Sequence, residues 1–70
     1  MKQVKETPTE VGTQFGAVWV YNENIWTNTF IVEGNERYNW LDVYGNTSHS
    51  DSLANLPWSI PGVEVIFIIN

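Results

Sequence analysis

The hydrophobic pattern is typical of strands that are separated by short polar turns. Three stretches are rich in aromatic and β-branched residues and a fourth is almost wholly apolar: Phe15–Tyr21, Ile25–Val32, Arg37–Tyr44 and Val63–Ile69. Two polar segments, Asn22–Asn24 and Glu33–Glu36, divide the first three stretches and predict two hairpins in succession. No long segment has a 3.6-residue apolar period, so no long helix is expected.

The fourth stretch, Val63–Ile69, predicts its own place in the sheet. Glu64 is its only charged residue, and such continuous apolar runs are typical of strands that are covered on both faces. A long apolar edge strand would promote aggregation. If the first three strands run up, down and up, the fourth can run down beside the first, which gives the spatial order 3-2-1-4. A strand covered by a second subunit would show the same pattern.

The register of the second hairpin follows from its aromatic residues. A three-residue loop through Glu36 gathers them on one face, whereas a two-residue loop disperses them. Cross-strand aromatic pairs stabilise a sheet by up to about 1 kcal/mol each, which favours the longer loop. The expected pairs are Phe30 with Trp40, Val32 with Tyr38, and Trp26 with Tyr44.

The remaining segments are polar. Residues 1–14 have no apolar period and are expected to form a flexible tail, which leaves 15–70 as a single small β domain. Gly45–Ser52 is expected to be a loop, followed by one short helical turn before the last strand. The predicted fold is an all-β, antiparallel, four-stranded meander that forms a bent sheet or a partly open barrel.

Composition limits how such a chain can be stabilised and where it acts. A domain of 70 residues is marginally stable, and the absence of cysteine excludes disulfides and thiolate metal sites. Aromatic residues, 14% of the chain, or self-association must therefore supply the stability. The sequence has no signal-peptide pattern and no apolar segment of about 20 residues, so we expect a soluble protein of the cytoplasm (the host cytoplasm, if the chain is viral).

The charge distribution indicates the kind of partner. The formal net charge is −5, and from Val11 onward Arg37 is the only basic side chain. Nucleic-acid binding requires several lysines or arginines to neutralise phosphates, and anionic membranes make the same demand. The sequence therefore argues against both and favours a larger protein with a basic surface patch.

No constellation of residues predicts catalysis. The segment Ser48–Ser52 places serine, histidine and aspartate together, but the members of a catalytic triad are normally brought together from separate segments. His49 is the only histidine, so a second imidazole for a metal site is absent. We therefore expect a non-enzymatic protein with no metal and no cofactor.

The aromatic face and the carboxylates near it form the predicted binding site. Tryptophan and tyrosine are enriched at protein interfaces, and carboxylates steer association with basic surfaces. The expected partner-binding residues are Trp26, Phe30, Tyr38, Trp40, Tyr44, Glu23, Glu33, Glu36 and Asp42. If the segment before the last strand covers this face instead, the same aromatic residues belong to the core.

These features favour a small inhibitor or regulator that occupies a surface of a larger protein. Compact, acidic, cysteine-free chains of this kind are typical of viral, phage or mobile-element proteins. Two alternatives remain open. One is a carbohydrate-binding module that stacks sugars on aromatic rings, and the other is a structural subunit that is completed by self-association.

Overall fold

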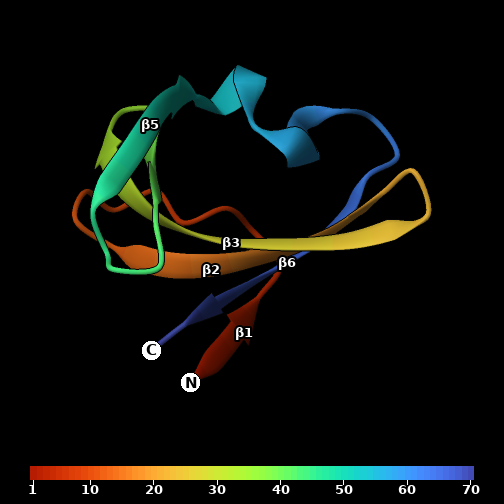
Figure 1. Ribbon diagram of the computed structural model, residues 1–70, viewed down its shortest axis with the longest axis horizontal. Helices are drawn as coiled ribbons and strands as arrows, with labels where there is room; N and C mark the ends of the chain where they lie inside the picture. Colours follow the sequence, from red (N-terminus) through yellow and green to blue (C-terminus); the bar gives the residue numbers. More distant parts are fainter.

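The chain folds into one antiparallel sheet of six strands. The computed structural model describes all residues, 1–70, and contains two 3₁₀ turns and no α-helix. Figure 1 shows a strongly curved sheet that does not close into a barrel. The strands are β1 (Lys2–Val4), β2 (Gln14–Tyr21), β3 (Asn24–Gly34), β4 (Arg37–Leu41), β5 (Thr47–Ser52) and β6 (Glu64–Ile69). The all-β prediction is confirmed, whereas the predicted number of four strands is wrong.

The four inner strands have the predicted arrangement. The order across the sheet is β1-β6-β2-β3-β4-β5, so β4, β3, β2 and β6 follow the expected 3-2-1-4. The apolar strand β6 lies inside the sheet, paired with β1 on one side and β2 on the other. Its two faces differ in burial: Phe67 is buried, with Val65 and Ile69 beside it packed against the core, whereas Ile66 and Ile68 on the other face are half-buried.

The two outer strands come from segments that the sequence pattern did not identify as strands. β1 lies in the predicted tail and pairs Lys2 with Ile69, and β5 lies in the predicted polar loop and pairs Arg37 with Ser52. Both segments are polar and lack alternation of apolar residues. Their pairing rests on main-chain hydrogen bonds, which any non-proline residue can make. A polar edge strand is therefore difficult to predict from the pattern of hydrophobic residues.

The first hairpin turns in two residues. Asn22 and Glu23 both adopt left-handed backbone conformations, with φ of 54° and 68°, between the paired residues Tyr21 and Asn24. Two consecutive positive φ angles are typical of a type I′ turn, whose twist matches that of the flanking strands. The turn predicted at Asn22–Asn24 is confirmed.

The second hairpin has the predicted aromatic pairs. Phe30 lies opposite Trp40 and Val32 lies opposite Tyr38. The extra residue is accommodated by a bulge at Glu33, after which pairing resumes, rather than by a three-residue loop. β4 ends at Leu41, so the expected pair of Trp26 with Tyr44 is not formed, and Trp26 instead faces Trp19 of β2.

The concave face of the sheet holds the core, and the segment between β5 and β6 covers it. The 3₁₀ turns η1 (Leu53–Asn55) and η2 (Pro57–Ser59) replace the single predicted helical turn and lie above the sheet in Figure 1. Leu56 is buried, and the Trp58 ring lies 5.0 Å from that of Phe30 and 5.3 Å from that of Phe67. The buried cluster comprises Phe15, Ala17, Trp19, Phe30, Val32, Tyr38, Leu56 and Phe67.

Candidate partner-binding surface

The structure divides the predicted aromatic residues between the core and the surface. Phe30 and Tyr38 are buried, and Trp40 packs against Phe30 with ring centroids 4.7 Å apart. The indole Nε1 of Trp40 donates a hydrogen bond to Asp51 Oδ2 at 2.9 Å, which satisfies its polar atom inside the fold. These three rings therefore lie in or against the core. Trp26 and Tyr44 are 48% and 86% exposed and remain accessible to a partner.

Tyr38 joins the N-terminal segment to the core. Its hydroxyl donates a hydrogen bond to the Pro8 carbonyl oxygen at 2.6 Å. Burial raises the pKa of the Tyr38 hydroxyl above its ordinary value, and the negative charge of Glu36 adds to this effect. Both causes disfavour the phenolate, so Tyr38 acts as a neutral donor that ties residues near Pro8 to the sheet.

The predicted carboxylates lie at opposite ends of β3. Glu23 occupies the β2–β3 turn, three residues before the exposed Trp26. Glu33 and Glu36 lie at the other end of the strand, where Glu33 Oε1 accepts a hydrogen bond from Ser50 Oγ at 3.2 Å and lies 3.8 Å from Arg37 Nε. The predicted site is therefore divided, and part of its charge at the Glu33 end is balanced by Arg37.

Asp42 organises the turn between β4 and β5. Its Oδ1 accepts hydrogen bonds of 2.9 Å from the N–H groups of Tyr44 and Asn46, and the Gly45 N–H donates to the Asp42 carbonyl at 3.0 Å. Gly45 has a φ of 86°, which its lack of a Cβ allows. The turn is thus fixed by its own polar groups, and it holds Val43 and Tyr44 out into solvent.

Sequence reasoning missed two of the most exposed apolar side chains. Val43 is 93% exposed in the β4–β5 turn, and Ile25 is 76% exposed beside the β2–β3 turn. The signal for the first was present, since aspartate at the first position and glycine at the fourth of Asp42–Gly45 are typical of a β-turn. We define the β2–β3 tip as Tyr21, Glu23, Ile25 and Trp26, and the β4–β5 tip as Asp42, Val43 and Tyr44.

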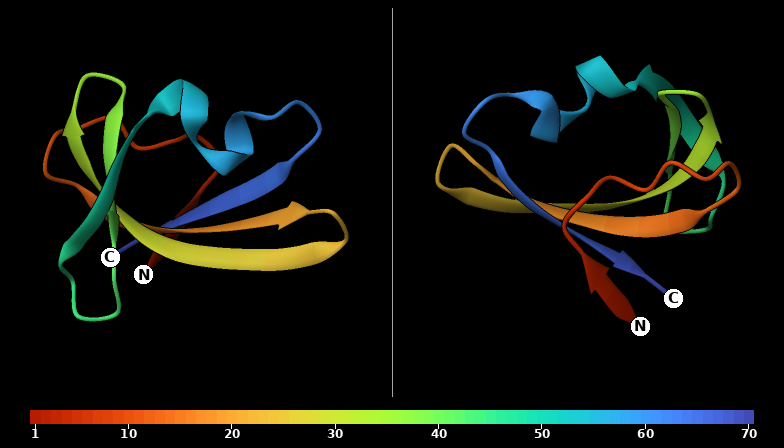
Figure 2. Two further views of the ribbon diagram at one scale, coloured as in Figure 1. Left: turned by 45° about the horizontal axis from the view of Figure 1, so that its top comes forward. Right: turned by 180° about the vertical axis from the view of Figure 1, so that it is seen from behind.

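An open hollow lies between β3 and the β4–β5 tip. Its volume is about 420 Å³. It is lined by Thr27, Asn28, Thr29, Leu41, Asp42 and Val43. In the left panel of Figure 2 the two tips lie apart, the β2–β3 turn at the right and the β4–β5 turn at the lower left, with β3 running between them. The tips therefore border one side of the molecule without forming a single patch.

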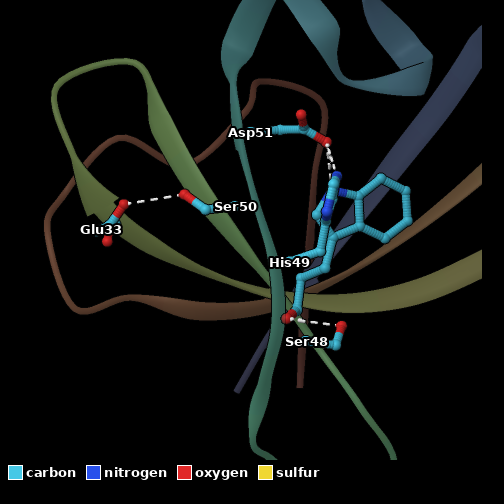
Figure 3. A network of polar contacts seen from close by, with 6 residues as sticks. Glu33, Ser48, His49, Ser50 and Asp51 are labelled. Carbon is cyan, nitrogen blue, oxygen red and sulfur yellow. Dashed lines mark hydrogen bonds and ion pairs between the residues drawn. The ribbon is translucent and has the colours of Figure 1, made fainter.

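The serine, histidine and aspartate residues of β5 do not form a catalytic triad. His49 Nε2 lies 2.9 Å from Asp51 Oδ2. Figure 3 shows this contact together with those of Ser48 and Ser50. Ser48 Oγ donates instead to the Trp40 carbonyl oxygen at 3.3 Å, and Ser50 Oγ bonds Glu33. A nucleophile must be hydrogen-bonded to its base, and neither serine hydroxyl bonds His49. The residues of this strand stabilise the sheet edge.

The structure brings no three carboxylate or imidazole groups together in an arrangement that could hold a metal ion.

None of the helical segments has the length and apolar character needed to cross a lipid bilayer.

Comparisons with protein-family models, with curated protein sequences and with solved structures found no match to this chain.

Proposed function

We propose that this chain is a non-enzymatic protein-binding module, which acts as an inhibitor or regulator by occupying a basic surface patch of a larger protein in the cytoplasm. The observation that carries the proposal is the exposure of large apolar side chains in fixed positions at the two tips, next to carboxylates. Exposed apolar groups rimmed by polar residues are typical of interaction sites. The tips are held by backbone geometry and by Asp42, so little entropy is lost when they bind.

The charge of this side of the molecule supports a basic partner. Glu23 and Asp42 belong to the tips, and the single arginine after Val11 lies at the far end of β3, beside Glu33. Carboxylates at the rim of an interface accelerate association with a positively charged surface. Trp26 and Tyr44 would then supply the buried contacts at the centre of each half of the interface.

The alternatives receive less support. Trp19, Trp40 and Trp58 pack together in or against the core, which leaves Trp26 as the one well-exposed indole for stacking a sugar. A subunit completed through β6 would find most of that strand occupied, because β2 pairs with β6 along its length and β1 pairs with Phe67–Ile69.

The test is a paired measurement of affinity and stability. The wild-type chain, immobilised, is used to isolate its partner, and the isolated protein is then titrated with the variants Trp26→Ala and Tyr44→Ala. We expect each variant to weaken binding by at least about 2 kcal/mol. Val11→Ala, an exposed apolar residue outside both tips, is the control and should bind as the wild type does.

Urea denaturation of the same variants separates binding from folding. Tyr44→Ala should retain nearly the wild-type free energy of unfolding, because that side chain is 86% exposed, and Trp26→Ala should remain folded, because about half of its surface is exposed. A loss of affinity that merely follows the fraction of unfolded protein would contradict the proposal. Equal affinity of all three variants would place the interface elsewhere.

A further inference from the structure

The first half of β3 has one free edge. The whole of β2 pairs with β3, from Tyr21 opposite Asn24 to Gln14 opposite Ile31. β4 pairs with β3 only from Thr29 to Gly34, because the chain turns away at Asp42. Figure 2, left, shows the lower edge of β3 without a neighbouring strand between the two tips. This part of the sheet therefore ends in an unpaired edge that is flanked by exposed side chains.

The main-chain N–H and C=O groups of β3 point alternately to its two sides, which identifies the groups that lie on the free edge. Val32 directs both of its groups towards the β2 side, since its N–H donates to the Thr13 carbonyl and its carbonyl accepts from the Gly12 N–H. Successive residues of an antiparallel strand point their main-chain groups to opposite sides. The register with β2 is unbroken from Ile31 back to Asn24. The N–H and C=O groups of Ile25 and Thr27 therefore point to the free edge.

The Asn28 side chain occupies the main-chain acceptors at the point where β4 ends. Its Nδ2 donates to the Thr29 carbonyl at 2.8 Å and to the Leu41 carbonyl at 3.3 Å. No comparable side chain caps Ile25 or Thr27, and the hollow of about 420 Å³ lies directly beside Thr27. Unpaired strand edges with adjacent space are the sites at which extended peptides add to a sheet.

We propose that the free edge of β3 binds an extended, basic peptide segment of the partner, which adds to the sheet as a further strand with hydrogen bonds to Ile25 and Thr27. This inference rests on the proposed function and specifies its binding mode. The added strand would run from the β2–β3 tip into the hollow, with one end near Glu23 and the other near Asp42. Its alternate side chains would contact Trp26 on the concave face and Ile25 on the opposite face.

Charge favours a basic peptide over a second copy of this chain. Antiparallel pairing of two β3 edges, with Ile25 opposite Thr27, would bring Glu23 of each copy towards Asp42 of the other. Both residues are acidic, no lysine or arginine lies in either tip, and each copy carries a net charge of −5. Like charges across an interface disfavour association, whereas lysine or arginine in the added strand would be attracted at both ends.

The experiment uses a synthetic heptapeptide of alternating lysine and valine with blocked termini. A peptide of alternating glutamate and valine is the control. Amide hydrogen exchange is followed by NMR on the full 70-residue chain. We expect the lysine peptide to slow exchange specifically at the Ile25 and Thr27 amides, and the glutamate peptide to leave both unchanged. The Val11 amide, which lies outside both tips and the hollow, should exchange at its original rate.

A pair of variants at one position tests the hydrogen bonds. Thr27→Pro removes the N–H on the free edge, where proline is tolerated because the group makes no bond within the sheet. It should lower the affinity for the lysine peptide by at least about tenfold, since it deletes one hydrogen bond and places a ring in the path of the strand. Thr27→Val keeps the N–H and the strand propensity, and should bind as the wild type does.

The second measurement does not depend on a folded proline variant. The lysine peptide is methylated on alternate backbone nitrogens in two complementary versions, so that each version blocks one edge of the peptide. One version should lose binding to the wild-type chain and the other should retain it. Equal affinity of both versions would overturn strand addition.

The outcomes also separate this inference from the proposed function. The edge proposal fails if the peptide perturbs Trp26 and Tyr44 without protecting the Ile25 and Thr27 amides. It also fails if an isolated basic partner binds and the peptide does not. In both cases the tips bind by another mode. If neither the peptide nor any basic partner binds, both proposals fail. Protection that increases with protein concentration in the absence of peptide would show that a second copy occupies the edge.

Discussion

The two halves of β3 have similar sequences and opposite environments. Phe30 and Val32 lie in the second half, between β2 and β4 and beneath η2, and both are buried. Ile25 and Trp26 lie in the first half, which has only β2 as a neighbour, and both are exposed. The apolar pattern continues through both halves. Whether an apolar residue of β3 is core or surface therefore depends on the neighbouring strand and on the face of the sheet, and not on the residue type alone.

The end of β4 produces this difference. Asp42 binds the N–H groups of Tyr44 and Asn46 and so turns the chain into the β4–β5 tip, one residue after Leu41. If β4 continued straight, it would cover the edge at Thr27 and Ile25 in the same way as it covers Ile31. A single side chain at the end of one strand thus leaves half of its neighbour unpaired.

The strongest test of the difference between the two halves of β3 is to truncate one aromatic residue in each half. Phe30→Ala should lower the free energy of unfolding by about 3–5 kcal/mol, because it leaves a cavity in the core. Trp26→Ala removes a larger side chain but should cost less, because about half of the Trp26 surface is already exposed. Urea denaturation measures both. Similar losses would show that the first half of β3 is buried in solution.

Removing the N-terminal segment would expose more of the edge of β6, on the other side of the sheet. Deletion of residues 1–10 removes β1, exposes the edge of β6, and leaves the buried Tyr38 hydroxyl without its acceptor, Pro8. An unsatisfied buried polar group costs about 1–3 kcal/mol, so we expect the melting temperature to fall. Because β6 is apolar, the shortened chain should also self-associate, which sedimentation would detect.

Deletion of residues 1–5 is the matched control for the Tyr38 hydrogen bond. It removes β1 but keeps Pro8, so it should expose the same edge with a smaller loss of stability. An unchanged melting temperature in both truncated chains would mean that the segment is a flexible tail in solution, as its polar sequence suggests.

The smallest expected effect is a dependence of stability on alkaline pH. The pKa of Tyr38 is raised in the folded chain, so above the ordinary tyrosine value of about 10 the unfolded chain loses its proton first. This contribution to stability is therefore complete below about pH 10 and is lost as the pH rises towards the folded-state pKa. Urea denaturation at about pH 8 and about pH 11 should show the decline, and it should be shallower in Tyr38→Phe. Parallel declines in both chains would assign it to other groups.

The sequence predicted those parts of the fold that depend on apolar side chains. The nearly continuous apolar run of β6 indicated an inner strand, and the match of Phe30 with Trp40 indicated the register of β3 and β4. β1 and β5 could not be predicted in this way. Their stability comes from main-chain pairing with β6 and β4, and hydrophobic periodicity carries no information about it.

The candidate site was predicted only in part, for a related reason. Trp26 and Tyr44 were expected on the same face as Phe30 and Tyr38, because the pattern of Arg37–Tyr44 reads as one continuous strand. The hydrogen bonds of Asp42 end that strand at Leu41. The first half of β3 has a free edge because β4 does not extend alongside it. That depends on how the strands are arranged in the folded sheet, so it could not be predicted from the sequence of β3 alone.

The division of the four tryptophans also has an optical consequence. Trp19, Trp40 and Trp58 form one cluster, with ring centroids 6.2 Å and 5.8 Å from Trp19, whereas Trp26 stands in solvent at the β2–β3 tip. Indoles at such separations couple electronically, so the cluster should give a strong near-ultraviolet circular dichroism signal that disappears on unfolding. Trp26 is about half exposed and is the indole most accessible to a soluble quencher. The native chain therefore carries two separate tryptophan signals, one from the cluster, which reports the packing of the core, and one from Trp26, which reports the occupancy of the tip, without any attached label.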